Sequence, residues 1–178
     1  MNTRYTRTAI SLHWLVALGL FGAFGLGLYM TDLPLSPYKL KLYSWHKWAG
    51  VSLFLLVLFR LGWRLGHPPP PLPMSMPAIL RVIAHLTHAL LYVLMIAIPL
   101  SGWLMSSAKG FQTVWFGLLP LPDLVAKNAE LGDQLQWLHM TLNYALAALV
   151  IAHIGAALKH RFIDRDDILS RMLPSARK

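Results

Sequence analysis

The chain has 178 residues, of which 56% are hydrophobic and only 13% are charged, whereas a soluble globular domain carries about 25% charged residues. These values indicate an integral membrane protein with a single domain, residues 1–178, and exclude an ordinary soluble enzyme. The chain contains no cysteine, which excludes disulfide bonds, thiolate metal sites and iron–sulfur clusters and leaves histidine as the main metal-binding residue.

Four apolar segments are long enough to cross a bilayer, and they cover about residues 9–30, 44–64, 79–105 and 135–158. The first is too long for the core of a signal peptide and is followed by no small-residue cleavage site, so we expect it to remain as a membrane helix. The prolines in GHPPPPLPMSMP predict an extended linker between the second and third segments. The loop at 106–133 is rich in aromatic residues, which favours a position at the membrane interface. The pattern predicts an all-α fold, a four-helix bundle in the membrane.

Basic residues predict the orientation, because cytoplasmic loops carry an excess of lysine and arginine. Of the sixteen basic residues, eleven lie on the side of both termini and the proline linker: Arg4, Arg7, Arg60, Arg64, Arg81, Lys159, Arg161, Arg165, Arg171, Arg177 and Lys178. The other five lie in or beside the loops at 31–43 and 106–133, and they are Lys39, Lys41, Lys47, Lys109 and Lys127. We therefore expect both termini in the cytoplasm, and the formal charge of +9 needs no nucleic-acid partner to explain it.

Histidines occur at two matching depths of the predicted bundle. His139 and His153 are fourteen residues apart in the last segment, which places them within about 40° of one helix face and about 21 Å apart along the axis. His46, near the outer end of the second segment, shares the level of His139. His13, near the inner end of the first segment, shares the level of His153. Ionisable groups inside a membrane are costly and are usually functional.

Imidazoles from two facing helices are a standard means of holding haem iron on both sides. A single membrane histidine is as often an interhelical hydrogen-bonding group, but four that pair by level are hard to explain in that way. A zinc site made of histidine alone needs three or four ligands at one level, whereas the outer level offers two. His85 and His88 lie at a depth similar to that of His13 and His153, so spacing alone leaves the inner pair open.

The chain resembles the bacterial cytochrome b561 family, in particular its superoxide-oxidising members. The resemblance covers RYTRTAISLHWLV, WHKWAGVSLFLLVLFRLGWR, AHLTHALLYVLMIAIPLSGW, LHMTLNYALAALVIAHIGAALKHRF and the tail DDILSRMLP. It implies a bundle that carries two stacked b-type haems, the inner one on His13 and His153 and the outer one on His46 and His139. It leaves His85 and His88 as neighbours without an assigned role. Arg60 and Arg64 become candidate partners of the inner haem propionates, or else ordinary anchors at the inner surface.

Iron held by two histidines has no open position, so such a centre transfers electrons. The resemblance implies that superoxide is oxidised at the outer face, where Lys39, Lys41, Lys47 and Lys109 would attract the anion, unless they are simply solvated loop residues. It also implies that ubiquinone is reduced at the inner face beside His160, which is seven residues beyond His153. A helix-capping role is the simpler alternative for His160.

Two other functional classes stay open at this stage. The chain could be a cytochrome b anchor subunit that links quinone to a partner oxidoreductase such as a hydrogenase, although no long soluble extension offers a docking platform. A transporter or structural bundle without haem would purify as a colourless protein. The favoured expectation is a multi-pass enzyme of the bacterial inner membrane that acts on superoxide and quinone and has no obligate protein partner.

Overall fold

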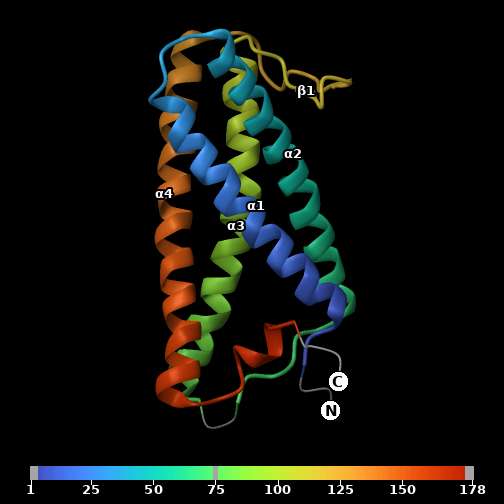
Figure 1. Ribbon diagram of the computed structural model, residues 1–178, viewed down its shortest axis with the longest axis vertical. Coiled ribbons are helices and arrows are strands. Elements are labelled where there is room, and N and C mark those ends of the chain that lie inside the picture. The colour runs from blue at the N-terminus through green and yellow to red at the C-terminus, as the bar shows by residue number, and fades with distance from the viewer. Residues whose placement is uncertain (1–3, 74–75, 175–178) are drawn as a thin grey trace.

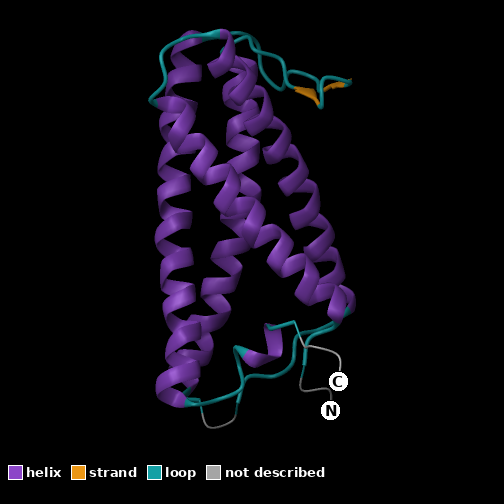
Figure 2. Cartoon of the chain, in the orientation of Figure 1, coloured by secondary structure: helices purple, strands orange, loops and turns teal. Residues whose placement is uncertain are grey.

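The computed structural model describes residues 4–73 and 76–174 of the chain. Figures 1 and 2 show a bundle of long helices joined by loops at both ends. The helices are α1 (Arg7–Thr31), α2 (Pro37–Gly66), α3 (Ala78–Ala108) and α4 (Ala129–Lys159). All four are long and apolar enough to cross a membrane. The chain is thus a multi-pass membrane protein with the predicted all-α architecture.

Each helix runs past the apolar segment that identified it, because the polar residues at its ends continue the helix outside the hydrocarbon. The second segment was expected over 44–64, whereas α2 covers Pro37–Gly66, 30 residues or about 45 Å. Side-chain caps fix three of the starts. The Thr6 hydroxyl accepts from the Ala9 N–H at 3.2 Å, and Ser36 and Asn128 serve α2 and α4 in the same way.

Both ends of the described chain lie at one end of the bundle, which we call the terminal end (Figure 1). The opposite end, called the hairpin end, carries the α1–α2 and α3–α4 connections. The helices pack as the pairs α3 with α4, α1 with α2 and α2 with α3, and α1 crosses the bundle obliquely (Figure 1). Among the described residues, the backbones of α1 and α2 make few close approaches to α4. Side chains or a bound group must therefore fill that space.

The buried core lies in the middle of the bundle. It consists of Val16, Val57, Leu91, Met95 and Leu146, with contributions from all four helices. Leu146 lies midway in sequence between His139 and His153, so the core separates the two histidine levels. Many large apolar side chains on the outer surface are exposed, for example Ile151 at 71%. Such exposure is expected for a surface that faces lipid.

The α3–α4 connection contains a short antiparallel hairpin made of β1 (Val114–Trp115) and β2 (Leu119–Pro120). It projects sideways from the bundle (Figure 1). Its turn has positive φ at Phe116 (50°) and Gly117 (72°), and Leu118 in the turn is 85% exposed. The sequence predicted an interfacial loop here but gave no sign of the hairpin.

After α4 the chain forms one π-helical turn, His160–Asp164, and then crosses beneath the bundle to a short 3-10 helix, Ser170–Met172. We call residues 165–173 the tail. Three hydrogen bonds attach it to distant parts of the chain. Trp14 Nε1 donates to Met172 O at 2.8 Å, Arg4 donates to Ser170 O at 3.1 Å, and Arg171 donates to Pro71 O at 2.7 Å. The tail therefore joins both halves of the bundle at the terminal end.

Candidate functional site

Near the hairpin end, His46 of α2 faces His139 of α4. Their ring centroids are 6.3 Å apart and their planes are inclined by 85°. The two rings therefore meet edge to face instead of stacking face to face. The pair joins two helices whose backbones make few close approaches.

Near the terminal end, His13 of α1 faces His153 of α4 in nearly the same geometry. The ring centroids are 6.4 Å apart and the planes are inclined by 72°. His88 of α3 is also close, with its ring centroid 5.3 Å from that of His153. His85, by contrast, is on the exposed side of α3.

The two ring separations agree with what one iron atom between two imidazoles requires. A metal–imidazole bond of about 2.0–2.1 Å places the two ligating nitrogens about 4 Å apart, and each ring centroid lies about 1.1 Å farther out, so the centroids should be about 6.4 Å apart. Both the His46–His139 and the His13–His153 pairs meet this value. The His88–His153 distance of 5.3 Å is too short for an iron atom in between.

Neighbouring groups fix the His139 ring in the form that a metal ligand needs. Its Nδ1 lies 3.0 Å from Ile98 O and 3.0 Å from Ser101 Oγ. Because a carbonyl only accepts, Nδ1 carries the proton and Nε2 is left with a free lone pair. Gly102 lies against the same ring, and a Cβ there would be 3.0 Å from His139 Cε1. Gly27 lies against His46 in the same way, at 3.3 Å.

Two arginines lie beside the terminal-end pair. Arg60 Nη1 is 2.8 Å from His13 Nδ1, and Arg60 Nε donates to the Tyr92 hydroxyl at 3.0 Å. The Arg64 guanidinium lies 6.0 Å from the centroid of the same Tyr92 ring. Neither arginine has a carboxylate partner among the described residues. They help to line a cavity together with Tyr5, Ala9, Trp63, His67, Pro69, Tyr92 and Met172. Two guanidinium groups that have no carboxylate partner in the described part of the chain, at such a cavity, favour an anionic group.

The prokaryotic cytochrome b561 family model matches residues 4–175, nearly the whole chain. The chain belongs to the prokaryotic cytochrome b561 family. It is 38% identical over 172 residues to cytochrome b561 homolog 2 of Escherichia coli (strain K12), covering 96% of this chain and 91% of the relative. It is 29% identical over 178 residues to the probable superoxide oxidase CybB of Yersinia pestis, covering 99% of both chains. The family consists of membrane electron-transfer proteins with b-type haem.

The lysines expected at the outer face lie at the hairpin end, and most of them contact other groups. Lys39 Nζ donates to the carbonyls of Thr31 at 3.1 Å and Leu33 at 2.5 Å, at the end of α1. The Lys41 ammonium lies 5.0 Å from the centroid of the Trp45 ring. Both keep an uncompensated charge, because no acidic residue in the described part of the chain pairs with either.

Lys47 and Lys109 are held more tightly. Lys47 Nζ donates to Phe111 O at 2.9 Å, beside a cavity of about 160 Å³ that lies away from His46 on α2. Lys109 Nζ forms an ion pair with Asp133 at 3.0 Å and a hydrogen bond with Gln136. The Lys109–Asp133 pair has no net charge, so it adds little to the field at the hairpin end.

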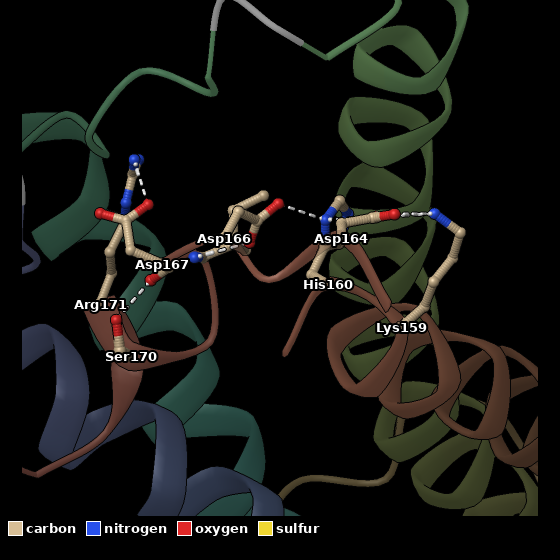
Figure 3. A network of polar contacts seen from close by, with 8 residues as sticks. Lys159, His160, Asp164, Asp166, Asp167, Ser170 and Arg171 are labelled. Carbon is tan, nitrogen blue, oxygen red and sulfur yellow. Dashed lines mark hydrogen bonds and ion pairs between the residues drawn. The ribbon is translucent and has the colours of Figure 1, made fainter. Parts of the chain in front are cut away.

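His160 lies at the junction between α4 and the tail, and its side chain is only 18% exposed. Figure 3 shows Asp164 and Asp166 directed towards its ring. Nδ1 is 2.7 Å from Asp166 Oδ2 and 3.2 Å from Asp164 Oδ2. The sequence singled out His160, but its carboxylate partners went unnoticed because they lie beyond the apolar helix. A histidine followed by acidic residues at i+4 and i+6 was the available signal.

Proposed function

We propose that this protein holds two b-type haems and conducts electrons between the two membrane surfaces. His46 and His139 would hold the haem at the hairpin end, and His13 and His153 the haem at the terminal end. The observation that carries the proposal is the pair of nearly equal ring separations, 6.3 Å and 6.4 Å, on helices whose backbones make few close approaches. A haem held by two imidazoles would supply one-electron chemistry and would leave no site for a substrate on the iron.

Arg60 and Arg64 suit a role as partners of the propionate groups at the terminal end. A guanidinium only donates hydrogen bonds, so in the 2.8 Å contact with Arg60 the Nδ1 of His13 must accept. Ligation of iron through Nε2 requires the proton to be on Nδ1, and Arg60 then needs another acceptor. A carboxylate is the natural choice, and Arg64 beside the same cavity can hold a second one.

Superoxide is the proposed electron donor at the hairpin end. Support comes from the relative named a probable superoxide oxidase, which aligns with this chain over 99% of its length. The uncompensated charges of Lys39 and Lys41 are suited to attracting a small anion. Lys47, next in sequence to His46, adds a third positive charge.

Ubiquinone is the proposed electron acceptor at the terminal end. His160 lies two helical turns beyond His153 and is partly exposed, so its Nε2 can meet the carbonyl oxygen of a quinone that arrives through the membrane. The excess of arginine and lysine at this end supports a cytoplasmic location, with the bacterial inner membrane as the site of action. No protein partner is required in this scheme.

Stopped-flow spectroscopy of the purified protein tests both ends in one experiment. A superoxide pulse should reduce the haem within milliseconds, and added ubiquinone should reoxidise it. In His160→Leu the reduction should stay fast and reoxidation by quinone should stall. Wild-type reoxidation in His160→Leu would contradict the quinone assignment, and haem that stays oxidised after the pulse would contradict the donor.

One observation favours the alternative of an electron-transfer anchor. The hairpin projects from the bundle and exposes Phe116 and Leu118, so it offers a docking surface. Recovery of a redox partner in a 1:1 ratio with the purified protein would support the anchor. Full turnover of superoxide with quinone by the isolated chain would support the enzyme.

A further inference from the structure

We propose that Asp166 is the positioning residue of the quinone site, holding the His160 ring in place and balancing the charge that the ring acquires when it takes up a proton. The proposal rests on the assignment of His160 to quinone given above. It adds a residue of the tail to the site and identifies the step in which that residue acts.

The distances select Asp166 over Asp164 as the partner of His160. The His160 Nδ1 is 2.7 Å from Asp166 Oδ2 and 3.2 Å from Asp164 Oδ2. Both oxygens of Asp164 are also held by Lys159 Nζ, at 2.7 Å and 2.6 Å. Asp166 has no basic partner besides His160 among the described residues. Its charge is therefore available to the imidazole alone.

The local backbone places Asp166 where it can act in this way. The π-helical turn ends at Arg165, whose left-handed conformation (φ 54°) reverses the chain. The Asp166 N–H then donates to His160 O at 3.1 Å, which brings the carboxylate back over the ring. The second carboxylate oxygen accepts from the Ile168 N–H at 3.1 Å. Both oxygens of Asp166 thus accept hydrogen bonds. Figure 3 shows the contact between the Asp166 carboxylate, in the tail, and the His160 ring.

Quinone reduction needs protons that the donor reaction does not supply. Two superoxide ions lose one electron each and leave as dioxygen, whereas ubiquinone takes up two electrons and two protons to give ubiquinol. Both protons must come from water at the terminal end. His160 would carry each proton on Nε2 to a quinone oxygen while Nδ1–H stays bonded to Asp166, and the partly exposed ring would then be reprotonated from solvent. A carboxylate at Nδ1 selects this tautomer and is the counter-ion of the imidazolium.

Asp166→Asn tests the proposal, since it keeps the shape and the acceptor oxygen but removes the charge. Asp167→Asn is the matched control, because Asp167 is the next residue and pairs with Arg171 at 2.8 Å instead of with His160. Haem is first reduced by superoxide, and its reoxidation is then followed over a range of ubiquinone concentrations in H₂O and D₂O. The maximal reoxidation rate of Asp166→Asn should fall about 10-fold or more, with a larger solvent isotope effect. Haem spectra and reduction by superoxide should not change.

Each other outcome points to a different failure. If Asp166 only helps to hold the tail in place, both variants should loosen the tail in the same way. The quinone concentration at half-maximal rate would then rise in both, and the maximal rate and the isotope effect would stay unchanged. That result would overturn the proposal. A normal maximal rate in Asp166→Asn together with stalled reoxidation in His160→Leu would also overturn it while keeping the quinone site at His160. Normal reoxidation in His160→Leu would instead refute the proposed function itself.

Discussion

At the scale of single residues, the two rings of the hairpin-end pair are held by different means. His139 is oriented by hydrogen bonding of Nδ1 with Ile98 O and Ser101 Oγ. The Nδ1 of His46 is buried and makes no hydrogen bond of good geometry in the described part of the chain, with the Ala23 backbone close to the ring, and its ring packs against Gly27. Hydrogen bonds fix a tautomer and packing does not. His139 is therefore the better oriented of these two proposed ligands.

Replacing either ring with alanine should remove one haem and leave the other. His46→Ala or His139→Ala should lower the haem content from about two to about one per chain, because each iron depends on its own pair of imidazoles. The core around Leu146 separates the two levels, so the terminal-end haem should keep its low-spin spectrum. A pyridine haemochrome assay gives the ratio. His85→Ala is the control, and a loss of both haems from a folded protein would argue against independent sites.

Gly102→Ala should disturb the hairpin-end haem without deleting a ligand. The new Cβ would lie 3.0 Å from Cε1 and 3.3 Å from Nδ1 of His139, so the ring must shift and its hydrogen bond to Ile98 O weakens. We expect a changed reduction potential or a partly high-spin signal for this haem alone, measured by redox titration with electron paramagnetic resonance. In Gly155→Ala, where a Cβ meets no atom within 4 Å, both haems should behave as in wild type.

At the scale of elements, the tail fastens the terminal end of the bundle. The Arg171 guanidinium donates one hydrogen bond to Pro71 O and another to the Asp167 carboxylate. The hydrogen bond from Arg171 to Asp167 holds the pKa of the Asp167 carboxyl below its usual value. Trp14 Nε1 attaches the other side of the tail to α1 through Met172 O. Because the tail also carries Asp166, its attachment bears on the proposed quinone site.

Trp14→Phe should loosen the tail while the apolar ring stays beside His13. Loss of one hydrogen bond of about 1 kcal/mol should raise the population of the detached tail about 5-fold. Trypsin cleavage after Arg171 should speed up accordingly, since that side chain is only 13% exposed. Trp103→Phe, which removes a similar bond to Pro122 O at the hairpin end, should leave this cleavage unchanged. Equal rates in both variants and wild type would show that the tail is held elsewhere.

The sequence was sufficient for the helices but not for the elements outside them. Apolar length reveals a membrane helix because lipid imposes it, and a fixed helical rise then places His139 and His153 on one face. The inner pair needed more, since His85 and His88 share a depth with His13 and His153 and spacing left the choice open. The family resemblance implied His13 and His153, and the ring distances agree with that prediction. The hairpin and the tail depend on hydrogen bonds such as Trp14 to Met172, between residues 158 positions apart. No local pattern records such a contact.

At the scale of the whole molecule, the two ends differ in charge and in proposed chemistry. The two proposed haems would form a path along α4 between them, and the His139 and His153 levels that would hold them lie about 21 Å apart. A change of charge at one end should therefore leave the rate of electron transfer at the other end unaltered, because charges in solvent are screened within about 10 Å at ordinary ionic strength. That independence separates an enzyme with two substrate sites from a simple structural bundle.

Neutralising the lysines at the hairpin end should slow only the superoxide step. In Lys39→Gln/Lys41→Gln two uncompensated positive charges are removed, so haem reduction by superoxide should slow about 3- to 10-fold at low salt and depend less on ionic strength. Reoxidation by quinone should match wild type, because it occurs at the other end of the bundle.

The control is Lys109→Gln/Asp133→Asn, which deletes an ion pair at the hairpin end without changing the net charge of that end. The rate of haem reduction in this control should stay within about 2-fold of wild type. If the control slows as much as the lysine variant, local structure and not the field governs the step. If neither variant slows, the lysines have no part in attracting superoxide, and the donor must reach the haem by a path that this charge does not influence.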